Sequence, residues 1–328
     1  MVARFIHSIL RANVAIAADG DLTYDLPVNP LSVILLNINP LNETSTIANY
    51  SLFQALLSAI DNVQISHKGA SVINASGADL AALAMLWHGM SIWQSNAVET
   101  DDDRRSLILP IMFGRRPYMP SECFPETKKG ELQMTVTWDI ADTGFDGLRM
   151  SVETIELPDA TPDFVQKFTT LAQTFAATGQ NDIDLPIGNP IRAILMHGTT
   201  SWAGATPAPT LGQLSVFLDN LQVGYTATDW EVLRGVMGLR GVNFPPSFEH
   251  IHSGTYTTTV AGDSLEPEIG LSKDAYYALL DFDPTHDDLY TLETEGAGRV
   301  NVRSIAEAAE AVRACPIEKV AVRKYMEG

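Results

Sequence analysis

The sequence predicts an all-β protein made of two tandem domains with the same fold. Its 328 residues exceed the usual size of one domain, so two domains of about 150 residues are expected. Runs in which apolar and polar residues alternate indicate strands, and short segments of the first half recur in the second half in the same order. A duplicated, strand-rich domain follows from these observations.

The first repeat is a proline-containing turn that precedes a strand. Residues 25–30 are DLPVNP and precede LSVILL, and residues 184–190 are DLPIGNP and precede IRAILM. A second match pairs IDNVQIS, residues 60–66, with LDNLQVG, residues 218–224. We expect each match to mark the same turn or strand in the two domains.

A third match predicts one short helix in each half. In both halves a Ser or Thr precedes an Asp by three residues, so that the first side chain caps the helix and the acid favours its positive end. A Gly then ends the helix. The residues are Ser76, Asp79 and Gly89 in the first half and Thr226, Asp229 and Gly238 in the second.

Strict alternation predicts a strand in ELQMTVTWDI, residues 131–140, with one face in a core and the other in solvent. The segment GLRMSVETIEL, residues 147–157, continues the pattern and then shifts phase, which predicts a bulge or a strand end near Glu153. Further strands are predicted in SVILLNI, NVQISH, SLILPIMF, FLDNLQVGY, GTYTTTVAG, RVNVRS and EKVAVRK.

Helical spacing is found in three other segments. Residues 161–179 begin with Thr-Pro, carry apolar residues along one side and end at Gly179, which predicts a helix that joins the domains. Shorter helices are predicted at residues 272–280 and 304–314.

The first 19 residues predict a short basic amphipathic arm. Arg4 and Arg11 lie beside an apolar stripe at helical spacing, and no acidic residue precedes Asp19. Such an arm packs on its own domain, or else contacts a membrane surface or a neighbouring subunit. The apolar run is too short for an export signal or for the roughly 20 residues of a membrane span, so we expect neither. The stripe consists of Val2, Phe5, Ile6, Ile9 and Leu10.

Strand-rich units of this length, each with an inserted helix, favour jelly rolls over immunoglobulin-like sandwiches, whose Cys and Trp spacing is absent. The predicted fold is therefore a double jelly roll. Its parts are an N-terminal arm at 1–19, a first eight-stranded jelly roll at 20–158, a linker helix at 159–180 and a second eight-stranded jelly roll at 181–328.

The chain is strongly acidic, with 40 Asp and Glu against 21 Lys and Arg and a formal net charge of −19. Such a surface repels phosphate, so we expect no direct sequence-specific binding of nucleic acid. Cys123 and Cys315 form neither a disulfide framework nor a metal-binding pair, which favours synthesis in a reducing compartment.

These features resemble the double jelly-roll major capsid proteins of tailless icosahedral viruses, especially bacteriophages with an internal membrane. The resemblance rests on the tandem arrangement, the repeated segments, the predicted inter-domain helix and the block LILPIMFGRRPYMPSECFPETKKGELQMTVTWDIADTG, residues 107–144. It implies a homotrimer of pseudo-hexagonal outline, in which three chains supply six barrels.

The resemblance also implies partners and a location. The trimer would contact neighbouring capsomers and minor or vertex proteins in the virion, after synthesis in the host cytoplasm. Because the termini of such proteins commonly face the particle interior, the arm around Arg4 and Arg11 would lie there, where it could contact an internal membrane.

Two pairs of residues have the spacing of metal ligands. Strand alternation would put His250 and His252 on one face, where they could hold zinc or copper, but no third ligand is apparent and a pair of ordinary polar-face histidines is the default explanation. Asp281 and Asp283 begin DFDPTHDD like a calcium loop, but the Gly and Glu of an EF-hand are missing and an exposed acidic turn is the alternative. We assign no metal ligand and no cofactor, and both pairs stay open.

The alternative function is a carbohydrate-active or carbohydrate-binding β-sandwich, because jelly rolls host glycoside hydrolysis by two carboxylates across a cleft. Acids crowd around DIADTGFDG, although this segment is also typical of a tight strand connection. No catalytic motif is present, and we assign no catalytic residue. The acids considered are Asp139, Asp142, Asp146, Glu153 and Glu156.

Overall fold

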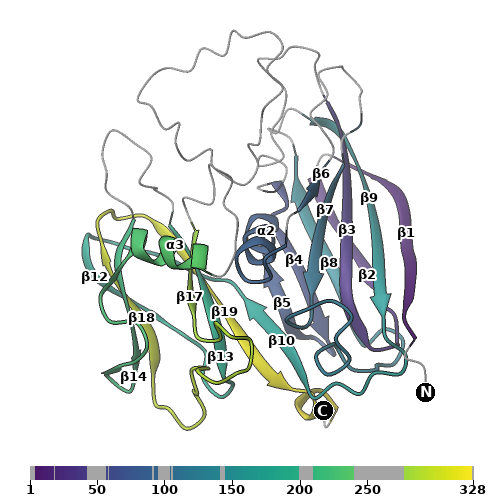
Figure 1. The fold of residues 1–328 in the computed structure, drawn as a ribbon. Helices are drawn as coiled ribbons and strands as arrows, with labels where there is room; N and C mark the ends of the chain where they lie inside the picture. The colour runs from purple at the N-terminus through teal and green to yellow at the C-terminus, as the bar shows by residue number, and fades with distance from the viewer. Residues whose placement is uncertain are drawn as a thin grey trace. The chain divides into compact units, whose positions relative to one another are not determined.

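The protein, in a computed structural model, is mostly β and divides into two compact units (Figure 1). Unit 1 comprises residues 1–170 and 317–328, and unit 2 comprises residues 171–316. The chain therefore enters unit 2 after Thr170 and returns to unit 1 at Ile317. The structure describes residues 4–17, 19–42, 57, 59–90, 92–94, 104, 106–140, 145–198, 210–239 and 277–326.

Unit 1 is a jelly roll, in which eight strands alternate between two sheets and a two-residue strand, β6, extends the first sheet. The first sheet has the order β1-β9-β3-β7-β6, and the second contains β5-β4-β8-β2. From the N-terminus to β9, the elements of this unit are β1 (Ile6–Ile16), β2 (Asp19–Asp25), β3 (Leu31–Asn42), β4 (Asn62–His67), β5 (Ala70–Ala75), α2 (Gly77–Leu86), β6 (Trp93–Gln94), β7 (Leu107–Met112), β8 (Leu132–Asp139) and β9 (Phe145–Glu156).

Unit 2 repeats this order strand for strand. In one sheet β11 and β13 flank β19, with β17 beside β13, and the other sheet has the order β12-β18-β14-β15. The prediction of two jelly rolls is thereby confirmed. The remaining elements are β10 (Phe164–Thr169), β11 (Leu171–Thr174), β12 (Gly179–Asp184), β13 (Ile191–Gly198), β14 (Leu211–Leu218), β15 (Leu221–Gln222), β16 (Thr228–Asp229), α3 (Trp230–Leu239), β17 (Tyr277–Asp281), β18 (Val300–Ala306), β19 (Ala311–Ala321) and α5 (Arg323–Met326).

The repeated proline-containing turn forms the same corner in both units. It joins β2 to β3 and β12 to β13, and equivalent backbone hydrogen bonds hold it on either side. Because Pro supplies no donor and fixes its own φ, the flanking leucines and isoleucines make these bonds. They are Leu26 N to Leu132 O at 2.9 Å and the reciprocal pair Leu31–Phe124 in unit 1, and Leu185 N to Val300 O at 2.8 Å and the reciprocal pair Ile191–Leu292 in unit 2.

The match between IDNVQIS and LDNLQVG does not mark one recurring strand. Residues 62–67 form β4, whose place in unit 2 is taken by β14, residues 211–218. Asp219 and Asn220 instead make the two-residue turn after β14, with φ of 49° and 70°. Asp and Asn tolerate this left-handed conformation, so the resemblance to the start of β4 is a coincidence of turn chemistry.

The two predicted helices are confirmed as α2 and α3, each placed between the same two strands of its jelly roll. Ser76 caps α2 by accepting from Asp79 N at 3.1 Å, and Gly89 follows with φ of 63°. The expected ends of α3 are wrong, because Thr228–Asp229 pairs with β14 as β16 and Gly238 lies within the helix.

The helix predicted to join the domains is absent, since residues 164–169 and 171–174 form β10 and β11. Both strands pair antiparallel with β19, β10 with its end in unit 1 and β11 with its end in unit 2. Aromatic and β-branched residues favour this state, and Gly179 begins β12 with φ of 98° instead of ending a helix.

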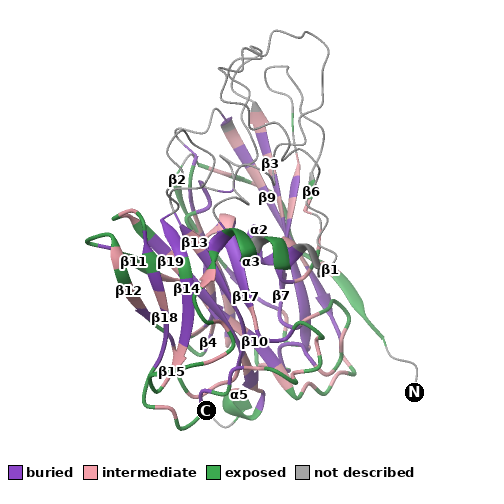
Figure 2. Cartoon of the chain, turned by 60° about the vertical axis from the view of Figure 1, so that its left-hand side comes forward, coloured by how far each residue is buried: buried purple, intermediate pink, exposed green. Residues whose placement is uncertain are grey.

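The N-terminal arm is likewise a strand, because β1 pairs with β9 from Ile6 to Ile16. Residues of β1 are largely exposed and green in Figure 2. The prediction of helices at 272–280 and 304–314 is also wrong: the described part of the first is β17, and the second overlaps β18 and β19. The strand predicted in GTYTTTVAG lies outside the described residues.

Apolar side chains occur on both faces of the first sheet in unit 1. Burial alternates along β8 as expected for a strand with one inner face. In β9, however, Ile155 packs with Val33 and Met112 on the face opposite to Val152 and Leu36. The phase shift near Glu153 reflects this second apolar face. The pairing of β9 with β1 also shifts register there, between Ile9 opposite Glu153 and Arg11 opposite Val152, while β9 continues to Glu156 without ending.

We predict that Ser76→Ala lowers the free energy of unfolding by about 1 kcal/mol, because the Asp79 N–H loses its acceptor. Ser76→Asp keeps an acceptor at the cap and should retain most of the stability. Urea unfolding of the two variants checks this. Equal losses in both would contradict the capping role.

Candidate functional site

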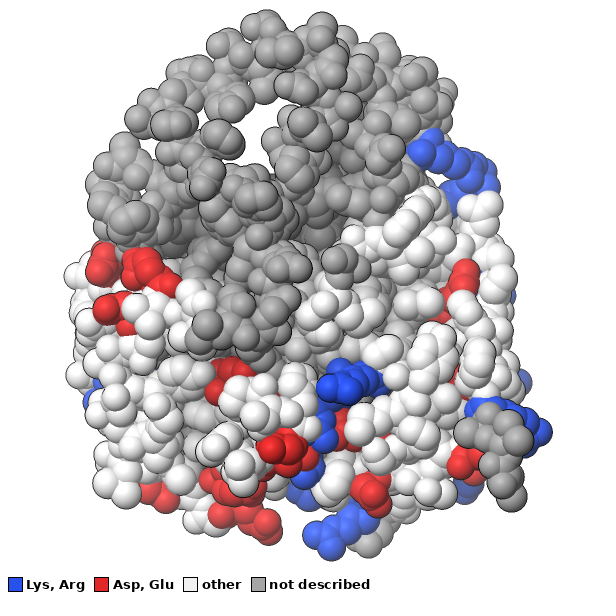
Figure 3. All heavy atoms as spheres, in the orientation of Figure 1, with Lys and Arg blue, Asp and Glu red and all other residues white. Residues whose placement is uncertain are grey.

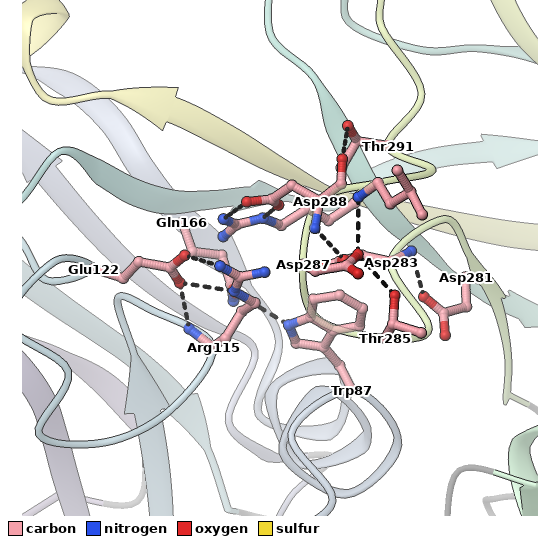
Figure 4. Close-up of polar contacts among 12 residues, drawn as sticks. Trp87, Arg115, Glu122, Gln166, Asp281, Asp283, Thr285, Asp287, Asp288 and Thr291 are labelled. Atoms are coloured by element: carbon pink, nitrogen blue, oxygen red, sulfur yellow. Dashed lines mark hydrogen bonds and ion pairs between the residues drawn. The ribbon is translucent and has the colours of Figure 1, made fainter.

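A buried arginine holds the loop that follows β17 in unit 2. Arg192 of β13 is fully buried and forms a two-pronged ion pair with Asp288 of the loop. The distances are 2.7 Å from Nε to Oδ1 and 3.2 Å from Nη2 to Oδ2 (Figure 4). The planar guanidinium suits this geometry and fixes the loop on the strand.

The acids of the DFDPTHDD loop bind the loop's own backbone. Asp281 Oδ1 accepts from Asp283 N at 2.9 Å, and Asp283 Oδ1 accepts from Asp288 N at 2.8 Å. The Thr285 hydroxyl and the Leu289 N–H donate to Asp287 and lower the pKa of its carboxyl. These hydrogen bonds give the carboxylates a structural role in the loop, and they do not support the calcium hypothesis.

The equivalent loop of unit 1, after β7, has its own internal ion pair. Buried Glu122 accepts from the Arg115 Nε at 3.2 Å and from the Arg115 backbone N at 3.1 Å. Beside α2, Trp87 Nε1 donates to Gln166 Oε1 of β10 at 3.1 Å. In both units, therefore, an arginine and an acid fix the connection between the same two strands.

These two ion pairs were not predicted from the sequence. Arg192 and Asp288 are 96 positions apart, and nothing in the segments IRAILM and DFDPTHDD that contain them indicates that they pair. Both loops follow a buried phenylalanine, Phe113 in unit 1 and Phe282 in unit 2, and this shared residue is the local signal of their equivalence.

The acids considered for glycoside hydrolysis do not form a catalytic pair among the described residues. Glu153 binds His7 Nε2 at 2.8 Å, and buried Glu156 accepts from the Ser8 hydroxyl at 2.7 Å, so both join β9 to β1. Asp139 is exposed at the end of β8. Asp142 and the side chain of Asp146 lie outside the described residues.

A hollow of about 580 Å³ lies in unit 2. Tyr225 and Phe282 contribute to its wall, with their rings edge to face and their centroids 5.4 Å apart. The Tyr225 hydroxyl donates to Asp281 O at 2.9 Å and accepts from Asp281 N at 2.7 Å, so it is already used by the backbone. The hollow could therefore contact a ligand through its aromatic rings, while the Tyr225 hydroxyl is bonded to the backbone of Asp281.

The predicted histidine pair, His250 and His252, lies outside the described residues. In the part of the chain that the structure describes, no three His, Cys, Asp or Glu side chains are grouped to hold a metal ion. Searched over the same residues, no helix is both long and apolar enough to cross a membrane. On the face drawn in Figure 3, acidic and basic side chains lie interspersed.

A buried histidine marks the place where the C-terminal segment returns to unit 1. The ring of His67 lies edge to face with Tyr325 at 5.8 Å and with Phe124 at 5.5 Å. Burial lowers the pKa of His67, as does the charge of Lys68, and Glu131, whose Oε2 lies 3.9 Å away, opposes them. Burial also raises the pKa of Tyr325.

No family model and no curated protein matches the chain. Solved structures share its fold along almost its whole length. The major capsid protein P2 from bacteriophage PM2 has a TM-score of 0.64 at 11% identity, covering 97% of this chain and 98% of that chain. A structure of Sulfolobus Turreted Icosahedral Virus gives 0.65 at 12% over 98% and 97%, and the PBCV-1 virus capsid gives 0.59 at 10% over 97% and 94%. The chain therefore has the double jelly-roll fold of viral major capsid proteins.

We predict that Arg192→Ala destabilises the protein by about 3–5 kcal/mol, because it leaves Asp288 without its buried partner. The control is Arg299→Ala, which removes an arginine that is 47% exposed and should cost less than about 1 kcal/mol. Urea unfolding compares the two. Similar losses would show that the buried pair does not hold the loop.

The lowered pKa of His67 also predicts a dependence on pH. The unfolded chain takes up a proton near the ordinary value of 6.5 and the fold does so only at lower pH, so stability is lost as the pH falls through 6.5. His67→Gln lacks this contribution and should lose less stability over the same range. Unfolding free energies measured above and below pH 6.5 test this, and parallel curves would refute it.

Proposed function

We propose that the protein is the major capsid protein of a tailless icosahedral virus, with a structural and not a catalytic role. The observation that supports this most is the pair of jelly rolls in one chain, matched strand for strand. The same pair extends over 98% of the PM2 capsid protein that the chain resembles in fold.

The duplication has a geometric use in a shell. Homo-oligomers favour closed symmetry, and three copies of a chain with two equivalent barrels can place six barrels in a pseudo-hexagonal ring. The partners in this proposal are other copies of the chain, neighbouring capsomers and minor or vertex proteins in the virion, with contact to an internal membrane through the N-terminal residues.

The carbohydrate hypothesis has less support. Glu153 and Glu156 join two strands, so two of the acids considered for hydrolysis already have structural hydrogen bonds. The hollow beside Tyr225 is the observation in its favour. Binding of oligosaccharides by a stable monomer would revive it.

We predict a stable trimer with a mass near three times 35.7 kDa in light scattering, because the fold must associate to close a ring. Negative-stain images of the same sample should show pseudo-hexagonal particles. A chain that stays monomeric at every concentration, or a dimer without such particles, would contradict the proposed function.

A further inference from the structure

The equivalent helices of the two units differ in how far they are covered. Almost every residue of α2 is buried, on all sides of the helix. In α3, by contrast, Trp230 and Leu233 are buried while Val232 and Val236 are 53% and 40% exposed. The outward side of α3 is green in Figure 2. Unit 2 thus leaves open an apolar helix surface that has no exposed counterpart in unit 1.

The first sheet of unit 1 has an open apolar surface of its own. We call it the outer face of unit 1: Ile9, Trp93, Leu35 and Ile108, on the side of the sheet away from its core. Trp93 pairs with Ile108, and Ile9 and Leu35 both pair with Glu153, so these side chains lie on the same side of neighbouring strands. Trp93 is 57% and Ile9 63% exposed, and the other two are half-buried.

The same positions of unit 2 are covered. Counted from the equivalent corner residues Leu31 and Ile191, Leu35 corresponds to Leu195. Ile108 corresponds to Tyr277, because each pairs with the equivalent residue of the preceding strand. Leu195 and Tyr277 are each only 2% exposed. Unit 1 therefore exposes its sheet face and buries its helix, and unit 2 exposes its helix and buries the equivalent sheet face.

From this complementarity we infer that α3 of one copy packs on the outer face of unit 1 in the next copy. The inference rests on the proposed function and names its contact. A contact between two different surfaces is heterologous, and it leaves no surface open when the copies close into a ring. A second copy is the partner that carries both surfaces in the required number.

Size and charge support this partner. A ten-residue helix is about 15 Å long, and the five strands β1-β9-β3-β7-β6 that carry the outer face span about 19 Å, so α3 can cover most of it. Glu231 is exposed beside Val232, and half-buried Arg149 lies on the same side of β9 as Glu153. Glu153 is bonded to His7 at 2.8 Å, so Arg149 is the charge on this face that Glu231 of the next copy can pair with.

An unpaired polar atom lies on the same face. Asn37 pairs with Ile108 across the sheet, and its buried Oδ1 has no hydrogen-bond partner among the described residues. A buried acceptor without a donor destabilises the free chain. Movement of the covering side chains on contact with an adjoining copy would let Asn37 accept a hydrogen bond from it.

The test introduces charge into one surface at a time. Val232→Glu with Val236→Glu should abolish the trimer and leave a folded monomer, as should Trp93→Glu on the other surface. Leu221→Glu is the matched control, since Leu221 is an apolar residue of unit 2 that is 72% exposed and outside both surfaces. Circular dichroism and the unfolding midpoint show that each variant is folded.

Mixing the two disrupted variants tests whether the contact is heterologous. One intact helix surface and one intact outer face remain in the mixture, so the variants should form a pair near twice 35.7 kDa and no trimer. A charge exchange tests the orientation: Glu231→Arg and Arg149→Glu should each weaken the trimer at least tenfold, and their combination should restore it.

The outcomes separate the inference from the proposed function. A wild-type chain that never forms trimers overturns the proposed function. Wild-type trimers that persist in the Val232→Glu, Val236→Glu variant overturn the inference alone, as does a mixture that stays monomeric or a charge exchange without recovery.

Discussion

The apolar character of both sides of one sheet is the constraint on which this structure depends. A sandwich can bury one face of each sheet in its own core. In unit 1, Leu36 and Val152 occupy that face, while Val33 and Ile155 are buried on the opposite side and Leu35 beside them is only half-buried. Exposure of the remaining apolar surface to water costs free energy, so burial of this side against another surface stabilises the protein.

The same constraint explains why duplication and assembly belong together. A single jelly roll with one open helix surface and one open sheet face would have to associate through both. Among the described residues of the two jelly rolls, α2 and the face that carries Leu195 and Tyr277 are buried, while α3 and the outer face of unit 1 expose apolar side chains. The ion pairs Arg192–Asp288 and Arg115–Glu122 fix the loops at equivalent places, so that each barrel keeps a defined shape.

Local chemistry made much of the fold predictable from the sequence. The proline-containing corners, the alternating strand 131–140 and the cap at Ser76 are set by residues next to one another, and these predictions are confirmed. The helix expected at 161–179 is wrong because strands β10 and β11 pair with the distant strand β19, and that pairing overrides local spacing.

Contacts between residues far apart in the sequence could not be predicted from local patterns. Apolar residues on both faces of β9 gave a pattern like that of an interrupted strand, and the exposed apolar residues of β1 have the spacing of an amphipathic helix. The acids Asp281 and Asp283 are typical of a calcium loop by type and spacing, but their bonds to the loop's own backbone appear only in three dimensions.

In the proposed assembly, the surface of α3 in one copy meets the outer face of unit 1 in the next copy. Electron cryomicroscopy of the purified oligomer, at a resolution that separates strands, tests this contact. We expect six barrels in a closed ring, with α3 of each copy lying across the outer face of the next. A ring in which α3 stays in solvent, or in which identical surfaces face each other, would contradict it.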